Sequence, residues 1–166
     1  MNTEKTLVKG SPAPEFSLPS HDGKAIHLSD LRGQFVVLYF YPKDATPGCT
    51  TEACDFRDLW PSFGNAVVLG VSPDSLSSHE KFAAKYNLPF PLLSDAEAGV
   101  AKQYGAYGEK VLYGKKTVGM IRSTFVIGPD GTLAAVFRSV KVAGHAEKVR
   151  QTLVSLGASH ETTAQA

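Results

Sequence analysis

The chain is organised around one stretch, Tyr41-Pro42-Lys43-Asp44-Ala45-Thr46-Pro47-Gly48-Cys49-Thr50-Thr51-Glu52-Ala53-Cys54. An apolar run, residues 35–40, precedes it and is typical of a strand buried on both faces. Proline and glycine then lead into residues 50–60, which can be helical. The pattern predicts a strand, a short loop and a helix whose first turn holds Cys49. Because unpaired N–H groups at a helix N-terminus carry partial positive charge, a thiolate is favoured there over a thiol.

The composition is that of an ordinary globular protein of 166 residues. We expect one domain, residues 1–157, followed by a disordered polar tail, residues 158–166. A net charge of +1 gives no reason to expect a nucleic acid or a membrane as partner. The N-terminus lacks the apolar core of a signal peptide, so we expect a cytoplasmic protein. In that reducing compartment a cysteine pair is more often catalytic or metal-binding than a structural disulfide.

The order of elements predicts an α/β fold. The pattern favours further strands in residues 24–28, 66–71, 90–93, 122–127 and 133–137, and helices in residues 77–86, 95–104 and 145–156. Ser77 and Glu80 form a capping box, and Gly128-Pro129-Asp130-Gly131 is a strong hairpin turn signal. Glycines make residues 105–120 a long loop with room for a small hairpin. A central mixed sheet flanked by helices on both faces, with a hairpin at its end, is the thioredoxin-like arrangement.

The chain has two cysteines, Cys49 and Cys54. A free cysteine is commonly a small buried apolar residue, and this interpretation suits Cys54 better because Cys49 follows Pro and Gly at a helix start. A zinc site is less favoured, since C-x4-C has no second pair and the five histidines form no ligand pattern. What remains is a reactive thiolate with a second thiol nearby, the pattern of a peroxide-reacting cysteine and its resolving partner. We expect no cofactor and no metal, and the chain has no phosphate-binding glycine motif.

The spacing of the two cysteines also limits how they can be joined. In an intact helix, positions i and i+5 have Cα atoms roughly 8–9 Å apart and side chains about 140° apart around the axis. A disulfide needs Cα atoms within about 7 Å of each other. A bond between Cys49 and Cys54 therefore requires the first turns of the helix to unwind.

The spacing Pro42-x-x-x-Thr46-x-x-Cys49 resembles the active-site pattern of peroxiredoxins. The whole stretch from Tyr41 to Cys54 resembles that of the bacterioferritin comigratory protein, or peroxiredoxin Q, subfamily. The likeness spans roughly residues 8–157 and continues in residues 10–16, 108–110, 113–115 and 122–127. It implies a monomeric thiol peroxidase that reduces hydrogen peroxide and organic hydroperoxides, with thioredoxin as the electron donor. It also implies that Cys49 is the peroxidatic cysteine and that Cys54 is the resolving one.

The resemblance assigns roles to further residues of the same pattern. Thr46 and Arg122 would organise the thiolate and the peroxide oxygens, Pro42 would shield the pocket, and Glu52 would orient the arginine. The chemistry agrees, because attack by a thiolate builds negative charge on the departing oxygen, which a hydroxyl and a guanidinium stabilise. A helix terminus stabilises a thiolate by at most about 2 kcal/mol. This is less than the free energy needed to lower the pKa of a thiol below neutrality, so a cation is needed as well. Simpler interpretations stay open: Thr46 as a helix cap, Pro42 as a strand end, and Arg122 in a solvated ion pair.

Other functions also stay open at this point. A thioredoxin-like disulfide reductase would share the fold, but the chain lacks C-x-x-C. A non-enzymatic redox sensor would oxidise once and then change its affinity for a partner. A structural adaptor would keep its function after Cys49→Ser. Catalytic turnover with thioredoxin separates the peroxidase from the sensor.

Overall fold

The computed structural model describes residues 7–158. The polar tail predicted from the sequence lies, from Ser159 on, outside the described residues. Ala158, which the sequence assigns to that tail, is buried, and its carbonyl accepts a hydrogen bond from the Asn65 backbone N–H at 2.9 Å. Among the described residues, no helix has both the length and the apolar character that crossing a lipid bilayer requires.

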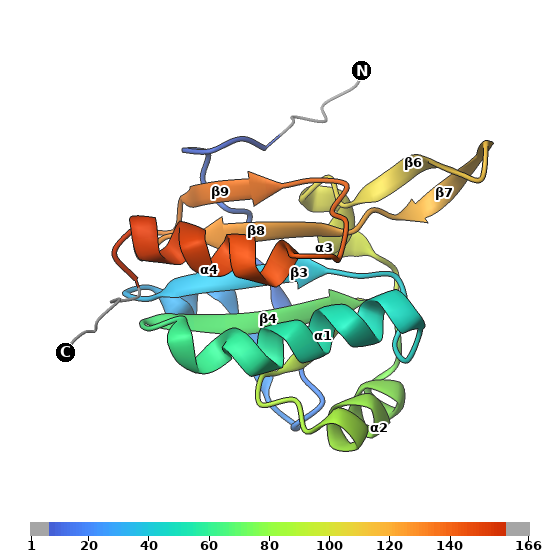
Figure 1. The fold of residues 1–166 in the computed structure, drawn as a ribbon, viewed down its shortest axis with the longest axis horizontal. Helices are drawn as coiled ribbons and strands as arrows, with labels where there is room; N and C mark the ends of the chain where they lie inside the picture. The colour runs from blue at the N-terminus through green and yellow to red at the C-terminus, as the bar shows by residue number, and fades with distance from the viewer. Residues whose placement is uncertain (1–6, 159–166) are drawn as a thin grey trace.

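A mixed sheet runs through the centre of the described chain in the order β5-β4-β3-β8-β9 (Figure 1). Its strands are β3 (Phe35–Phe40), β4 (Ala66–Ser72), β5 (Leu92–Ser94), β8 (Ser123–Ile127) and β9 (Leu133–Phe137). The central strand β3 pairs in parallel with β4 and antiparallel with β8, and β8 and β9 form an antiparallel hairpin. The predicted mixed sheet with a terminal hairpin is confirmed.

Side chains of β3 alternate between two apolar cores, one on each face of the sheet. Val37 and Tyr39 join the core under α1, α2 and α4, and Val36 and Leu38 join the core under α3. Short N-terminal elements cover this second face together with α3. The helices are α1 (Pro47–Leu59), α2 (Leu76–Tyr86), α3 (Gly99–Gln103) and α4 (His145–Ser155). The short elements are β1 (Ser17–Pro19), β2 (Ala25–His27) and the 3-10 helices η1 (Leu28–Leu31) and η2 (Trp60–Ser62). The thioredoxin-like layering predicted from the sequence is confirmed.

The capping box predicted for α2 and the predicted start of α3 are wrong. The cap of α2 is Ser75, whose hydroxyl accepts a hydrogen bond from the Ser78 N–H, so the Ser77–Glu80 capping box does not form at the helix start. The helix predicted for residues 95–104 begins only at Gly99, because Ala98 adopts a left-handed backbone with φ of 58°. A left-handed residue interrupts a right-handed helix.

The segment predicted as a long loop with room for a small hairpin forms a regular hairpin. Its strands are β6 (Tyr107–Leu112) and β7 (Lys115–Met120), and it extends away from the body of the molecule (Figure 1). Tyr113 and Gly114 form the turn with φ of 54° and 78°. Positive φ at both central residues matches the twist of a two-residue hairpin, a turn that the sequence signal did not specify because tyrosine rarely adopts it.

Candidate active site

The candidate site forms where the chain leaves β3. The loop of residues 41–46 passes through Ala45, with φ of 65°, and α1 then begins at Pro47, earlier than the residue 50 predicted. Proline suits the first helical position because it has no N–H to leave unpaired and its φ already fits the helix. Cys49 is therefore the third residue of α1, within the helix N-terminus as predicted.

Arg122 joins the thiol to a carboxylate across the sheet. The β3–β8 register pairs Phe40 with Ser123, so Arg122 lies beside the end of β3. Its Nη2 donates a hydrogen bond to Cys49 Sγ at 3.4 Å, and its Nη1 donates to Glu52 Oε1 at 2.6 Å. These three predicted site residues, which come from α1 and from the residue before β8, are thus brought into direct contact.

The electrostatics of this contact depend on burial. The Glu52 side chain is 1% exposed and that of Arg122 17% exposed. Burial raises the pKa of Glu52 to about 7, although the charge and hydrogen bond of Arg122 lower it. Burial alone would lower the pKa of Arg122, but the nearby Glu52 and Cys49 raise it, so the guanidinium stays charged. Arg122 is therefore not the solvated surface ion pair considered above.

The two cysteines have environments opposite to those the sequence suggested. Cys49 is 1% exposed and belongs to the core under α1, whereas Cys54 is only partly buried. The interpretation of Cys54 as the small buried residue is therefore wrong, because Pro and Gly at a helix start do not imply exposure when the helix packs on a sheet. Both thiols are free, and both lie in the intact α1.

Thr46 and Pro42 stand on the loop that leads to Cys49. Thr46 occupies the cap position of α1, but its hydroxyl donates to the Lys43 carbonyl at 2.9 Å and makes no cap hydrogen bond to the helix. The interpretation of Thr46 as a side-chain cap is therefore wrong. Pro42 is partly buried in the same loop. A Cβ on Gly48 would lie 3.4 Å from Nη2 of Arg122, so glycine leaves the guanidinium room at the helix start.

A buried polar network beside this loop was missed by the sequence analysis. Asp44, inside the loop, accepts a hydrogen bond from the Tyr41 hydroxyl at 2.6 Å and lies 2.6 Å from Nδ1 of His79. Asp44 belongs to the stretch of residues 41–54, whereas His79 belongs to no motif recognisable in the sequence. Among the described residues, Asp44, Asp74 and His79 are the group with metal-like spacing. Their atoms hydrogen-bond within the network, with Asp74 Oδ2 accepting from the Asp44 N–H at 2.7 Å, so we interpret it as an ion pair and not as a cation site.

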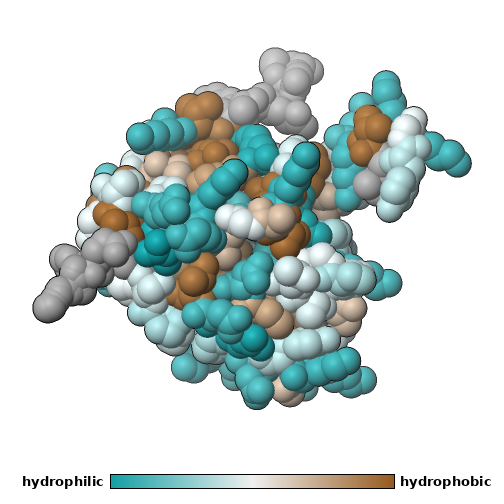
Figure 2. Space-filling model, viewed as in Figure 1, coloured by the Kyte–Doolittle hydropathy of each residue, from teal (hydrophilic) through white to brown (hydrophobic). Residues whose placement is uncertain are grey.

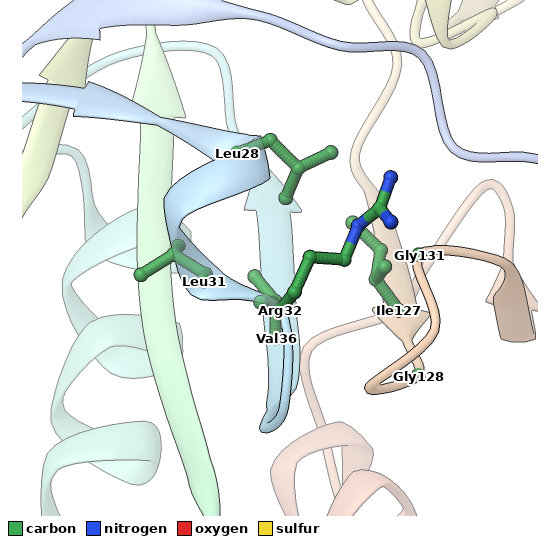
Figure 3. A pocket seen from close by; sticks show the side chains of 7 residues that line it. All are labelled: Leu28, Leu31, Arg32, Val36, Ile127, Gly128 and Gly131. Atoms are coloured by element: carbon green, nitrogen blue, oxygen red, sulfur yellow. The ribbon is translucent and has the colours of Figure 1, made fainter.

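The small cavity in Figure 3 lies at the opposite end of β3 from Cys49. Its volume is about 10 Å³, and Val36 at the start of β3 and Arg32 face it together with the β8–β9 turn. A single water molecule needs at least about 10–15 Å³, so this cavity is too small for a substrate.

Comparison with known proteins identifies the family of the chain. A model of the AhpC/TSA family matches residues 9–136. The chain belongs to this family. The peroxiredoxin Bcp of Bacillus subtilis is 49% identical over 150 residues, which cover 89% of this chain and 96% of the relative. The peroxiredoxin Bcp of Escherichia coli is 43% identical over 145 residues, which cover 86% and 93%.

Solved structures of the same subfamily share the fold of this peroxiredoxin. A Xylella fastidiosa peroxiredoxin Q mutant with a cysteine replaced by serine superposes with a TM-score of 0.86 at 41% identity, covering 93% of this chain and 99% of that chain. A Xanthomonas campestris bacterioferritin comigratory protein, studied for its alkyl peroxide reduction activity, gives 0.80 at 43% identity, covering 85% and 91%. This chain is thus a peroxiredoxin of the Bcp or peroxiredoxin Q type, with peroxide substrates and a thiol reductant.

Proposed function

We propose that this peroxiredoxin reduces hydrogen peroxide and organic hydroperoxides with Cys49 as the attacking thiolate and Cys54 as the resolving thiol. The observation that carries the proposal is the guanidinium of Arg122, which bonds Cys49 Sγ at 3.4 Å and Glu52 Oε1 at 2.6 Å. The helix N-terminus and the guanidinium both place positive charge beside the attacking sulfur. The alkyl peroxide reduction activity of the X. campestris relative supports organic hydroperoxides as substrates.

In the first step the Cys49 thiolate attacks one oxygen of the peroxide. An S–O bond forms, the O–O bond breaks, and the departing oxygen takes the electron pair and a proton to leave as water or an alcohol. Arg122 donates to the developing anion, and Glu52 holds the guanidinium in place. The Thr46 hydroxyl, whose hydrogen is donated to the Lys43 carbonyl, can accept a hydrogen bond from the peroxide. Pro42 shields the reacting atoms from solvent. Cys49 is left as a sulfenic acid.

In the second step Cys54 closes an intramolecular disulfide. Its thiolate attacks the sulfenic sulfur, an S–S bond forms and the hydroxyl leaves as water. Because the cysteines are five residues apart in α1, the first turns of the helix unwind for this step. Thioredoxin, acting as a dithiol, then returns two electrons by thiol–disulfide exchange. We propose that the cycle runs in a cytoplasmic monomer without a bound cofactor.

The experiment is intact mass after one equivalent of hydrogen peroxide is added to the reduced protein. The wild type should lose two hydrogens, Cys54→Ser should gain one oxygen at Cys49, and Cys49→Ser should not react. Turnover with thioredoxin and thioredoxin reductase then separates an enzyme from a redox sensor, which would oxidise once and stop. A wild type that stays unmodified for minutes would contradict the proposal.

A further inference from the structure

The polar network beside the site fastens the active-site loop to the rest of the protein. Asp44, in that loop, is 6% exposed. Its Oδ1 accepts from the Tyr41 hydroxyl at 2.6 Å, and its Oδ2 accepts from the Ser78 hydroxyl at 2.8 Å and lies 2.6 Å from Nδ1 of His79. The Asp44 backbone N–H donates to Asp74 Oδ2 at 2.7 Å. One loop residue is thereby tied to the end of β3, to the β4–α2 connection and to α2.

The neighbours of His79 define its charge. The residue is fully buried, and its Nε2 lies 2.9 Å from the backbone carbonyl oxygen of Leu93, which can only accept a hydrogen. Its Nδ1 faces the Asp44 carboxyl. Burial would raise the pKa of Asp44, but the hydrogen bonds from His79 and Tyr41 outweigh burial and lower the pKa overall. Asp44 is therefore ionised at neutral pH. Both ring nitrogens then carry hydrogens, and such a histidine is an imidazolium.

The ion pair stands beside a strained turn. Ala45, the next residue after Asp44, has φ of 65°, a left-handed conformation that alanine adopts only where its surroundings impose it. Thr46 closes the turn by donating to the Lys43 carbonyl at 2.9 Å. The turn that presents Thr46 is therefore shaped by contacts on the Asp44 side.

We propose that the Asp44–His79 ion pair positions the peroxidase site by holding this turn in one shape, both in the reduced protein and after α1 has unwound to form the disulfide. The proposal rests on the peroxidase function given above. The contacts of the pair lie at Tyr41 directly after β3, in the β4–α2 connection, in α2 and in β5, so unwinding of α1 leaves them intact. The hydrogen bond from the Thr50 N–H to the Thr46 carbonyl, at 2.8 Å, is the first that unwinding breaks. The fixed turn is then the end from which α1 rewinds.

Ring-nitrogen NMR of the ¹⁵N-labelled, reduced wild type at pH 7 tests the charge. His79 should show hydrogens on both nitrogens. His145 is the internal control, because it is also buried, its Nε2 lies 2.8 Å from the Thr124 hydroxyl, and burial lowers its pKa to about 4. His145 should therefore show one bare nitrogen. A bare nitrogen on His79 would overturn the ion pair.

Hydrogen exchange tests the anchor in the two redox states. In the disulfide form, made with diamide so that peroxidase activity is not required, the Asp44 amide should stay protected while the Thr50 amide loses protection. Loss of both would overturn the proposal even if no variant could be produced. This result is independent of the proposed function, which would be contradicted by a wild type that does not reduce peroxide.

His79→Gln tests whether the ion pair affects the oxidation of Cys49. His145→Gln is the matched control, because it also replaces a buried histidine. His79→Gln should lower Asp44 amide protection and slow the second-order oxidation of Cys49 by about tenfold or more, because a displaced turn misplaces the groups around the peroxide. His145→Gln should lose stability but keep the oxidation rate within about twofold, since it does not touch the turn. A folded His79→Gln with both wild-type values would contradict the proposal.

Discussion

The two cysteines of α1 are five residues apart and have contrasting environments. Cys49 is buried in the core, whereas Cys54 is partly exposed on the helix surface. Burial raises the pKa of the Cys54 thiol, Arg57 opposes this, and Asp58 and Asp55 add to it. One helix thus holds a thiol that accepts a hydrogen bond from a guanidinium and a second thiol that lies near Arg57 and two carboxylates.

This difference follows from helical geometry and divides the work between the thiols. A turn of 100° per residue places positions i and i+5 about 140° apart, so they cannot share one environment. The N-terminal position of Cys49 adds the partial charge of unpaired N–H groups, which falls off after the first turn. In the proposed cycle, attack therefore suits Cys49, and Cys54 reaches the oxidised sulfur only when α1 opens. The predictions below remove or increase this contrast.

Arg122→Ala should have the largest effect, because it removes the cation that donates a hydrogen bond to the sulfur of Cys49. Loss of one preorganised donor to a developing anion slows a reaction by about 100- to 1,000-fold. Stopped-flow fluorescence of Trp60, the only tryptophan in the chain, can follow oxidation of Cys49 at the other end of α1. Arg122→Lys keeps the charge but not the two-pronged geometry, so its oxidation rate should lie between those of the wild type and Arg122→Ala. A near-normal rate for Arg122→Ala would remove it from the site.

Glu52→Gln tests the buried carboxylate behind Arg122 through the pH dependence of stability. The folded protein holds the Glu52 proton up to about pH 7, whereas the unfolded chain releases it near 4.5. Its contribution to stability is therefore full below pH 4.5 and is lost as pH rises through 7, a change of about 3 kcal/mol. The free energy of unfolding of Glu52→Gln, measured in urea relative to the wild type, should therefore increase by this amount between pH 4.5 and 7.5.

His145 provides the opposite slope within the same pH range. Burial lowers its pKa to about 4, so its stabilisation is present above pH 6.5 and is lost as pH falls through 4. This contribution is common to the wild type and to Glu52→Gln and cancels in their difference. A difference that stays flat with pH would mean that Glu52 is ionised throughout.

The sequence predicted the parts of this contrast that depend on local pattern. The strand of residues 35–40, the hairpin turn at residues 128–131 and the position of Cys49 in a first helical turn were all recognisable. Arg122 was named through the family resemblance, but its contact with Cys49 depends on the β3–β8 register, which no local pattern specifies. Two features follow from packing alone and were missed: the burial of Cys49, and the pairing of Asp44 with His79, 35 residues away.

Asp58→Asn should make Cys54 a little more like Cys49. Removing a carboxylate that raises the pKa of the Cys54 thiol increases the thiolate fraction, so disulfide formation should speed up a few-fold below the pKa. Arg57→Gln should act in the opposite direction. In both variants the oxidation of Cys49 should be unchanged, and quenched-flow mass spectrometry separates the two steps. Equal rates of disulfide formation in both variants and the wild type would mean that unwinding, not ionisation, limits the step.

Thr51→Ala should give the smallest effect and addresses the unwinding itself. The Thr51 hydroxyl donates to the Pro47 carbonyl at 3.0 Å within the first turns of α1, a contact that slightly destabilises helices. Alanine is the better helix former by about 0.5 kcal/mol, so the closed helix gains stability and disulfide formation should slow about twofold. Thr152→Ala is the matched control, because its hydroxyl makes the same contact, to the Lys148 carbonyl at 2.9 Å, in α4.

The pair of threonine variants distinguishes a local from a global opening. Both substitutions should stabilise the folded protein to a similar extent in urea unfolding, since each removes the same hydroxyl-to-carbonyl hydrogen bond within a helix. Only Thr51→Ala should slow the disulfide step if α1 unwinds alone, because a helix that stays folded in both states contributes equally to them. Equal slowing by both variants would mean that α4 opens together with α1. Disulfide formation between Cys49 and Cys54 would then require a larger unfolding than the geometry of α1 alone demands.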